Sequence, residues 1–146
     1  MEIRLTRRPL SLAAASKALE GPGMGGVVVF TGRVRPDRAA GGAVVSIDYE
    51  SDTRAARRRL GEIVAVAHRQ FGAERIVLWH RIGRVRVNET SVIAGAACGH
   101  RAEAFAATRF LIEELKRSVP LWKSERVRSA RRPRRRRAPP VGRSSG

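Results

Sequence analysis

Two lysines on either side of Pro120 are the residues of this chain best suited to acid–base or nucleophilic chemistry. Proline ends a helix and turns the chain, so Lys116 is expected at a helix end and Lys123 on the segment after the turn. Two ammonium groups that converge on one pocket lower each other's pKa and free an amine for proton transfer or nucleophilic attack. In the alternative interpretation, Lys116 interacts with the C-terminal dipole of its helix and Lys123 is a solvated charge. Spacing alone does not choose between the two.

Arg33 and Arg35 form a second candidate group, with Val34 between them. They follow an apolar run, VVVF, that is typical of a strand buried on both faces. Side chains alternate along an extended backbone, so the two guanidinium groups are expected to point the same way. Together they could bind a phosphate or carboxylate through paired hydrogen bonds. The alternative is a pair of exposed charges at a strand end.

His100 and Arg101 come at the predicted start of a long helix. The backbone N–H groups of a helix N-terminus attract anions, and Arg101 adds a full positive charge. A cation at this position opposes the helix dipole, so Arg101 is unexpected unless an anion binds nearby. His100 could bind a ligand or transfer a proton, and its alternative is a capping or packing role.

Other common catalytic arrangements find little support in the residues. Cys98 and His100 would share a side only on a strand, and Cys98 is interpreted as a small core residue. Residues 21–26 (GPGMGG) lead into a strand and lack the Gly-Lys-Ser/Thr of a phosphate-binding loop. One cysteine cannot form an internal disulfide, and with three histidines a structural zinc site is not expected. A reducing, cytoplasmic setting fits this composition.

The net charge of +17 is unevenly distributed over the 146 residues. Residues 126–146 contain nine arginines and no acidic residue, which leaves a net charge of +8 on residues 1–125. A basic excess favours anionic partners, such as nucleic acid, a phosphorylated metabolite or an acidic protein. Residues 1–127 are predicted to be one domain and residues 128–146 a disordered Arg/Pro-rich tail. A nucleic-acid-binding protein acting through this tail is the alternative function, although the tail lacks aromatic side chains.

The elements that must position these residues follow from apolar spacing and from Gly and Pro breakers. Strands and helices in mixed order predict an α+β or α/β fold, in which two long helices cover a mainly antiparallel sheet. Within residues 43–50, Val45, Ile47 and Tyr49 are expected on one side. We predict helices over residues 9–20, 53–71 and 101–119, strands over residues 2–5, 26–34, 43–50, 74–82, 90–98 and 121–127, and a mobile loop over residues 35–42. No segment has the length of a membrane span, and the apolar run after Arg7 and Arg8 is too short for an export signal.

Five segments occur together in an order and spacing that resemble the catalytic large subunit of molybdopterin synthase. They are residues 30–35 (FTGRVR), 49–50 (YE), 80–83 (HRIG), 100–105 (HRAEAF) and 115–125 (LKRSVPLWKSE). Each segment alone is a weak signal, but five in register are specific. The resemblance covers residues 2–127, and Ser124 departs from it by replacing a residue that is commonly basic.

The resemblance implies an α/β hammerhead-type fold and a dimer of large subunits, each bound to a ubiquitin-like sulfur-carrier small subunit. It implies conversion of cyclic pyranopterin monophosphate into molybdopterin, with sulfur from the carrier's C-terminal thiocarboxylate, and no metal or organic cofactor on the large subunit. Catalytic roles are expected for Lys116 and Lys123. Substrate binding is expected for Arg33, Val34, Arg35, His100, Arg101, Ser124 and Glu125. A non-catalytic relative that only docks the carrier remains an alternative.

Overall fold

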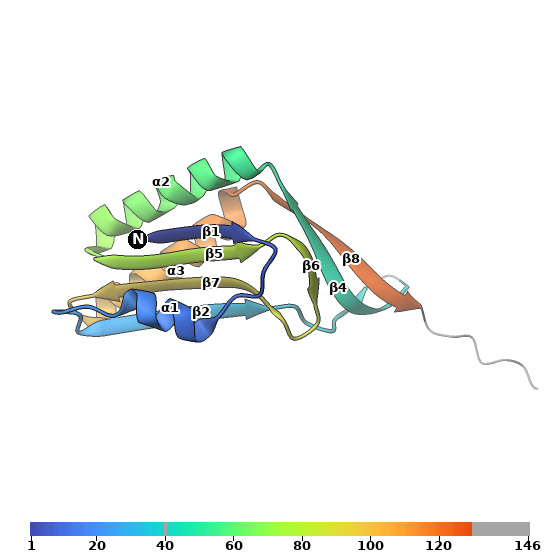
Figure 1. Ribbon diagram of the computed structural model, residues 1–146, viewed down its shortest axis with the longest axis horizontal. Coiled ribbons are helices and arrows are strands. Elements are labelled where there is room, and N and C mark those ends of the chain that lie inside the picture. The colour runs from blue at the N-terminus through green and yellow to red at the C-terminus, as the bar shows by residue number, and fades with distance from the viewer. Residues whose placement is uncertain (40, 130–146) are drawn as a thin grey trace, which may run out of the picture.

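The computed structural model describes residues 1–39 and 41–129, which form three helices and eight strands (Figure 1). In chain order the elements are β1 Glu2–Thr6, α1 Leu12–Leu19, β2 Gly26–Arg33, β3 Arg38–Ala39, β4 Gly42–Ser51, α2 Thr53–Phe71, β5 Arg75–Arg81, β6 Gly83–Arg86, β7 Thr90–Cys98, α3 Arg101–Ser118 and β8 Leu121–Ser129. The predicted α+β class is confirmed. The strands form two sheets, whereas the sequence predicted one.

The first sheet has the strand order β1-β5-β7-β2, with β1 parallel to β5 and the other pairs antiparallel. Helices α2 and α3 cover one face, and the short helix α1 covers the other (Figure 1). Successive side chains of β5 point to opposite faces of the sheet. Ile76 and Leu78 pack under the two long helices, while Val77 and Trp79 pack under α1. The central strands β5 and β7 are therefore buried on both faces.

The second sheet is built around β4, which pairs antiparallel with β3, β6 and β8. The long strands β4 and β8 extend from the helical part of the molecule (Figure 1). Their own small core contains Val34, Val44, Ile47, Tyr49 and Val85. Because β8 directly follows α3, this sheet brings the end of that helix close to β4.

Local signals explain the helix boundaries. The Asp52 carboxylate accepts a hydrogen bond from the N–H of Ala55 at 3.0 Å and begins α2 at the predicted residue. The predicted first helix begins three residues late, because the Ser11 hydroxyl caps it by accepting from the N–H of Ala14 at 3.1 Å. Pro120 ends α3 as predicted, one residue after the extended Val119.

Several strand predictions need correction. The VVVF run lies in β2, an edge strand whose Val27 and Phe30 are exposed, so it is not buried on both faces. On β4, the residue that shares the buried side with Ile47 and Tyr49 is Val44, because a register shift between Val44 and Ser46 turns Val45 outward. The predicted loop over residues 35–42 contains β3, and β6 was missed because it is only four residues long.

At the C-terminal end, β8 runs to Ser129, two residues beyond the predicted domain boundary. The rest of the predicted disordered tail lies outside the described residues. Cys98 is buried in the main core, and burial raises the pKa of its thiol, as suits a small core residue. Within residues 1–39 and 41–129, no helix is long and apolar enough to cross a lipid bilayer.

Candidate functional site

The end of α3 and the start of β8 bring the two candidate lysines together. Lys116 lies in the last turn of α3, and the chain turns at Pro120 into β8, where Lys123 lies opposite Tyr49 of β4. Lys116 and Lys123 line the same cavities, so the pocket hypothesis for this pair is the one that agrees with the geometry. The chain has only three lysines among its 30 basic residues, and two of them meet here.

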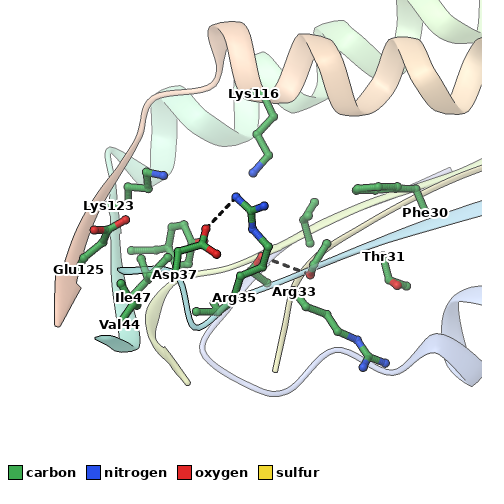
Figure 2. Close-up of a pocket in the computed structure, with 15 residues that line it drawn as sticks. Phe30, Thr31, Arg33, Arg35, Asp37, Val44, Ile47, Lys116, Lys123 and Glu125 are labelled. Carbon is green, nitrogen blue, oxygen red and sulfur yellow. Dashed lines mark hydrogen bonds and ion pairs between the residues drawn. The ribbon is translucent and has the colours of Figure 1, made fainter. Parts of the chain in front are cut away.

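An outer cavity of about 520 Å³ opens beside these lysines (Figure 2). Four cationic side chains line it, together with two carboxylates and several apolar groups. The lining comprises Phe30, Thr31, Gly32, Arg33, Val34, Arg35, Asp37, Val44, Ile47, Tyr49, Ser91, Val92, Lys116, Lys123 and Glu125. This balance leaves the walls with a formal excess of two positive charges, so the cavity is suited to a small anion.

Arg33, Val34 and Arg35 line the outer cavity in three different ways. The Arg35 guanidinium points toward Lys116, whereas that of Arg33 points away from it (Figure 2). Strand β2 ends at Arg33, so strand alternation does not extend to Arg35, and the prediction that both point the same way is wrong. Val34 is buried and forms part of the wall. Its N–H donates to the carbonyl of Glu89 at 3.1 Å.

Asp37 places a negative charge beside Arg35. Its carboxylate is 2.9 Å from the Arg35 guanidinium, and both side chains are largely exposed (Figure 2). The backbone carbonyl of Asp37 accepts a hydrogen bond from the N–H of Val44 at 3.0 Å, which fixes this residue against β4. An anion that binds Arg35 must therefore compete with an internal carboxylate that is already in place.

An inner cavity of about 310 Å³ lies against the same two lysines. Tyr49, Lys116 and Lys123 line both cavities, so the two are neighbours. The inner walls add Leu115, Val119 and Leu121, which are apolar, and one histidine, His80 of β5. Burial raises the pKa of the Tyr49 hydroxyl, which keeps this group protonated at neutral pH.

The electrostatics of Lys116 differ from those of an ordinary surface lysine. Partial burial lowers the pKa of its amine, and the positive charge of Lys123 lowers it further. Both effects disfavour the ammonium form because it would be poorly solvated and close to a like charge. Lys116 therefore carries a larger fraction of neutral amine at a given pH than a free lysine does.

Ser124 does not line either cavity. Successive side chains alternate across β8, so Lys123 and Glu125 face the outer cavity while Ser124 lies on the opposite side. There it lines an open depression with Arg84 and Arg126, whose guanidinium groups both pair with Asp48.

His100 and Arg101 lie at the opposite end of α3 from Lys116. Both side chains are exposed, and His100 precedes the helix without capping it through its side chain. Arg101 and Lys116 are separated by about 22 Å along the axis, at the 1.5 Å rise per residue of an α-helix. Within one chain, neither residue reaches the cavities.

The described residues contain no group of three or more His, Cys, Asp or Glu side chains arranged to hold a metal ion. The charged side chains that line the outer cavity are instead four cations and two carboxylates, a balance that favours anions.

Comparison with known proteins places the chain in a protein family. The family model described as MoaE protein matches residues 5–118. The chain belongs to the MoaE protein family.

The relatives of this MoaE family member agree in name. The chain is 40% identical over 122 residues to molybdopterin synthase catalytic subunit 1 of Mycobacterium tuberculosis, and the match covers 84% of this chain and 82% of that protein. The crystal structure of molybdopterin synthase from Staphylococcus aureus superposes with a TM-score of 0.80 at 26% identity, covering 86% and 91% of the two chains. A complex of subunits 1 and 2 of the molybdopterin-converting factor from Helicobacter pylori has the same fold, with a TM-score of 0.73, 18% identity and coverage of 95% and 94%.

Three ionisable lining residues of this MoaE protein were not among the predicted site residues: Asp37, Tyr49 and His80. Tyr49 and His80 belong to segments that carried the resemblance, so a signal for them existed in the sequence. Nothing in the sequence distinguished Asp37, which reaches the site only because the segment after β2 folds back along β4.

Proposed function

We propose that this chain is the catalytic subunit of a cytoplasmic molybdopterin synthase. It transfers sulfur from the C-terminal thiocarboxylate of a small ubiquitin-like carrier to cyclic pyranopterin monophosphate. The observation that supports this most directly is the convergence of Lys116, Lys123 and Arg35 on one cavity. The names of the relatives point to the same reaction.

The charges of the proposed reactants match those of the cavity. The pterin precursor carries a cyclic phosphate and the carrier ends in a thiocarboxylate, so both are anions that guanidinium and ammonium groups bind. Arg35 is directed at the centre of the cavity and is our candidate for the phosphate. Arg33 lines the rim, and Val34 shapes the wall between them.

The two lysines have different roles in this proposal. Lys116, whose pKa is lowered, transfers a proton or stabilises the negative charge that develops at the attacked carbon. Lys123 orients the thiocarboxylate or the phosphate and keeps the pKa of Lys116 low. Glu125, two residues along the same face of β8, limits the positive charge of the cavity.

His100 and Arg101 enter the proposal through a second copy of the chain. They cannot reach the cavity of their own chain, and the exposed ring of Phe105 lies one helical turn along α3 from Arg101. An exposed aromatic side chain beside an exposed arginine is typical of a surface that another subunit covers. In a dimer, the start of α3 of one copy completes the phosphate site of the other.

The small carrier subunit is the second proposed partner. The structure from Helicobacter pylori is described as a complex of two molybdopterin-converting factor subunits, and it shares the fold of this chain. The carrier's C-terminal thiocarboxylate must reach Lys116, so the outer cavity is the place where its tail would end.

The proposal is tested by incubating the protein with thiocarboxylated carrier and pterin precursor and detecting the dithiolene product by mass spectrometry. Lys116→Ala should reduce turnover by about 10²–10⁴-fold, as for loss of a general acid–base group. Lys116→Arg keeps the charge but cannot lose its proton, so it separates proton transfer from charge stabilisation. Lys17→Ala, in α1, is the matched control and should keep full activity. Normal turnover by folded Lys116→Ala would remove Lys116 from the mechanism.

The sequence left two alternative functions open: nucleic-acid binding through the Arg-rich tail, and docking of the carrier without catalysis. The comparisons give no support to nucleic-acid binding as the main function. A relative that only docks the carrier would have no need for two lysines and Arg35 around one cavity, and it would bind the carrier without forming product.

A further inference from the structure

His80 is a buried histidine that the proposed reaction does not yet use. It lies in β5 with only 2% of its surface exposed, and its ring lines the inner cavity together with Lys116 and Lys123. The Tyr49 ring packs edge-on against it, with 4.9 Å between centroids and 76° between planes. Burial of an ionisable side chain beside two lysines is costly unless the imidazole stays neutral.

The backbone fixes the tautomer of this imidazole. Nδ1 of His80 is 2.6 Å from the carbonyl oxygen of Arg81. A carbonyl oxygen can only accept, so Nδ1 must carry the hydrogen and donate it. In the neutral ring, Nε2 is then left with a lone pair and no hydrogen. His80 can therefore accept a hydrogen bond in the cavity but cannot donate one.

We infer that His80 is a positioning residue for Lys116: its Nε2 accepts a hydrogen bond from the Lys116 amino group, directly or through one water molecule. This inference rests on the proposed function, since it concerns how Lys116 is presented to the substrate. An amine that donates one N–H toward His80 has its nitrogen lone pair directed elsewhere. Lys116 also lines the outer cavity, which His80 does not line, so the inference presents the lone pair to that cavity.

The locked tautomer matters for the neutral form of Lys116. An imidazole that could donate N–H would bind the amine lone pair and compete with proton transfer. His80 leaves this lone pair free. Burial and the nearby charge of Lys116 lower the pKa of His80 to about 4, against a hydrogen bond to the Arg81 carbonyl that raises it, so the ring stays neutral at physiological pH.

Other ionisable groups also face Lys116 and act in parallel with His80. They are Tyr49 of β4, Lys123 and Glu125 of β8, and Arg35 and Asp37 after β2. Arg33, the last residue of β2, lines the same cavity with its guanidinium directed away from Lys116. Burial raises the pKa of the Tyr49 hydroxyl, so Tyr49 adds no charge to this surrounding near pH 7.

The first test measures, by NMR on the protein without substrate, which nitrogen of His80 carries a hydrogen and whether the other nitrogen interacts with Lys116. The chain has three histidines and three lysines, so ¹⁵N spectra of the rings and ¹³C spectra of dimethylated lysines are simple to assign. We expect His80 to show a protonated Nδ1 and an unprotonated Nε2, and its Nε2 signal to move in Lys116→Met. A protonated Nε2 in the wild-type protein would overturn the inference even if every His80 variant failed to fold.

Variants of His80 give the second test. His80→Phe keeps the volume and removes the acceptor, so it should lower the pKa of Lys116 below its wild-type value, because the ammonium form loses a partner. His80→Gln restores an acceptor near the Nε2 position and should return most of this shift. His68→Phe is the matched control, because His68 also bonds a backbone carbonyl, that of Ala73 at 2.9 Å, but lies in α2 away from the cavities.

Kinetics separate positioning from binding. His80→Phe should lower kcat by about tenfold, the equivalent of one lost hydrogen bond, with KM nearly unchanged, and His80→Gln should recover most of it. If kcat and the Lys116 pKa are both unchanged in folded His80→Phe, the inference is wrong. If wild-type protein forms no dithiolene while the spectra show the His80–Lys116 coupling, the proposed function fails and the contact itself stands.

Discussion

Lys116 and Lys123 line the same two cavities, although they belong to a helix and a strand that Pro120 separates. The turn at this proline places the last residues of α3 beside β8, and pairing of β8 with β4 holds Lys123 opposite Tyr49. Partial burial lowers the pKa of Lys116, and the nearby positive charge of Lys123 lowers it further, because close approach of two like charges is unfavourable. The charge of Lys123 therefore influences the protonation of Lys116.

Replacing Lys123 should change how activity depends on pH. In Lys123→Met the like charge is removed, so the pKa of Lys116 should rise toward its usual value. Activity that needs the neutral amine would then require a higher pH, and the rising limb of the pH–rate profile should move to higher pH. The profile of kcat measured from pH 6 to 10 checks this, and a profile that stays in place would show that the lysines are not coupled.

Mixing two inactive variants tests the proposed second copy. Lys116→Ala and Arg101→Ala should each be inactive alone if a site combines Lys116 of one copy with Arg101 of the other. In a random mixture, half of the two-fold dimers are mixed and each has one intact site, so about a quarter of wild-type activity should return. The measurement is turnover after exchange of subunits. Recovery of no activity, with dimers present in light scattering, would contradict shared sites.

Asp37 should weaken anion binding at Arg35. Removing its charge in Asp37→Asn frees the guanidinium, and loss of an exposed ion pair of this kind should tighten binding of inorganic phosphate by about two- to fivefold. Asp48→Asn is the control, because it removes the same charge from a pair of arginines outside the cavity. Calorimetry measures the affinity of each variant for inorganic phosphate. Equal gains in the two variants would assign the effect to net charge alone.

His80 should make the fold sensitive to acid. Its pKa is lowered from 6.5 to about 4 in the folded protein, so the unfolded chain binds an extra proton between these pH values. Stability is then complete above pH 6.5 and falls as the pH drops toward 4, by about 3 kcal/mol in total. Urea unfolding at pH 7.5 and 4.5 should show a smaller loss in His80→Phe than in the wild type. His68→Phe should keep the full loss.

The Arg-rich C-terminal segment should be dispensable for catalysis. Ending the chain after Ser129 keeps all of β8 and removes seven arginines. Turnover should remain close to that of the full chain, while any binding to nucleic acid should fall and lose its salt dependence. Product formation and DNA binding are measured on the same preparation of the full chain and of the shortened chain. Loss of sulfur transfer on truncation would favour a role of this segment in the main activity.

The sequence predicted the elements whose limits are set by local chemistry. The breaker at Pro120 and the apolar spacing along each helix act over a few residues, and α2 and α3 were predicted nearly to the residue. The convergence of Lys116 and Lys123 could be posed as a hypothesis for the same reason, since a proline between two lysines predicts a turn of the chain.

Features that depend on distant pairing could not be predicted. Whether β2 lies at an edge depends on which strands flank β7, and the bulge that replaces Val45 by Val44 in the core arises only when β4 meets β8. His80 was recognisable as part of a motif, yet its burial depends on β5 lying between β1 and β7 and under α3. The separation of His100 from Lys116 followed from the helix itself, because a helix of 18 residues keeps its two ends apart.

Helix α3 carries His100 and Arg101 at its start and Lys116 at its end, so in the proposed dimer its length sets the distance between two parts of the shared sites. One inserted residue would lengthen it by about 1.5 Å and rotate one end by about 100° relative to the other. Such an insertion would leave each cluster intact and the core nearly as apolar as before. It would nevertheless put the two clusters out of phase, so this helix should tolerate exchange of side chains far better than any change in its number of residues.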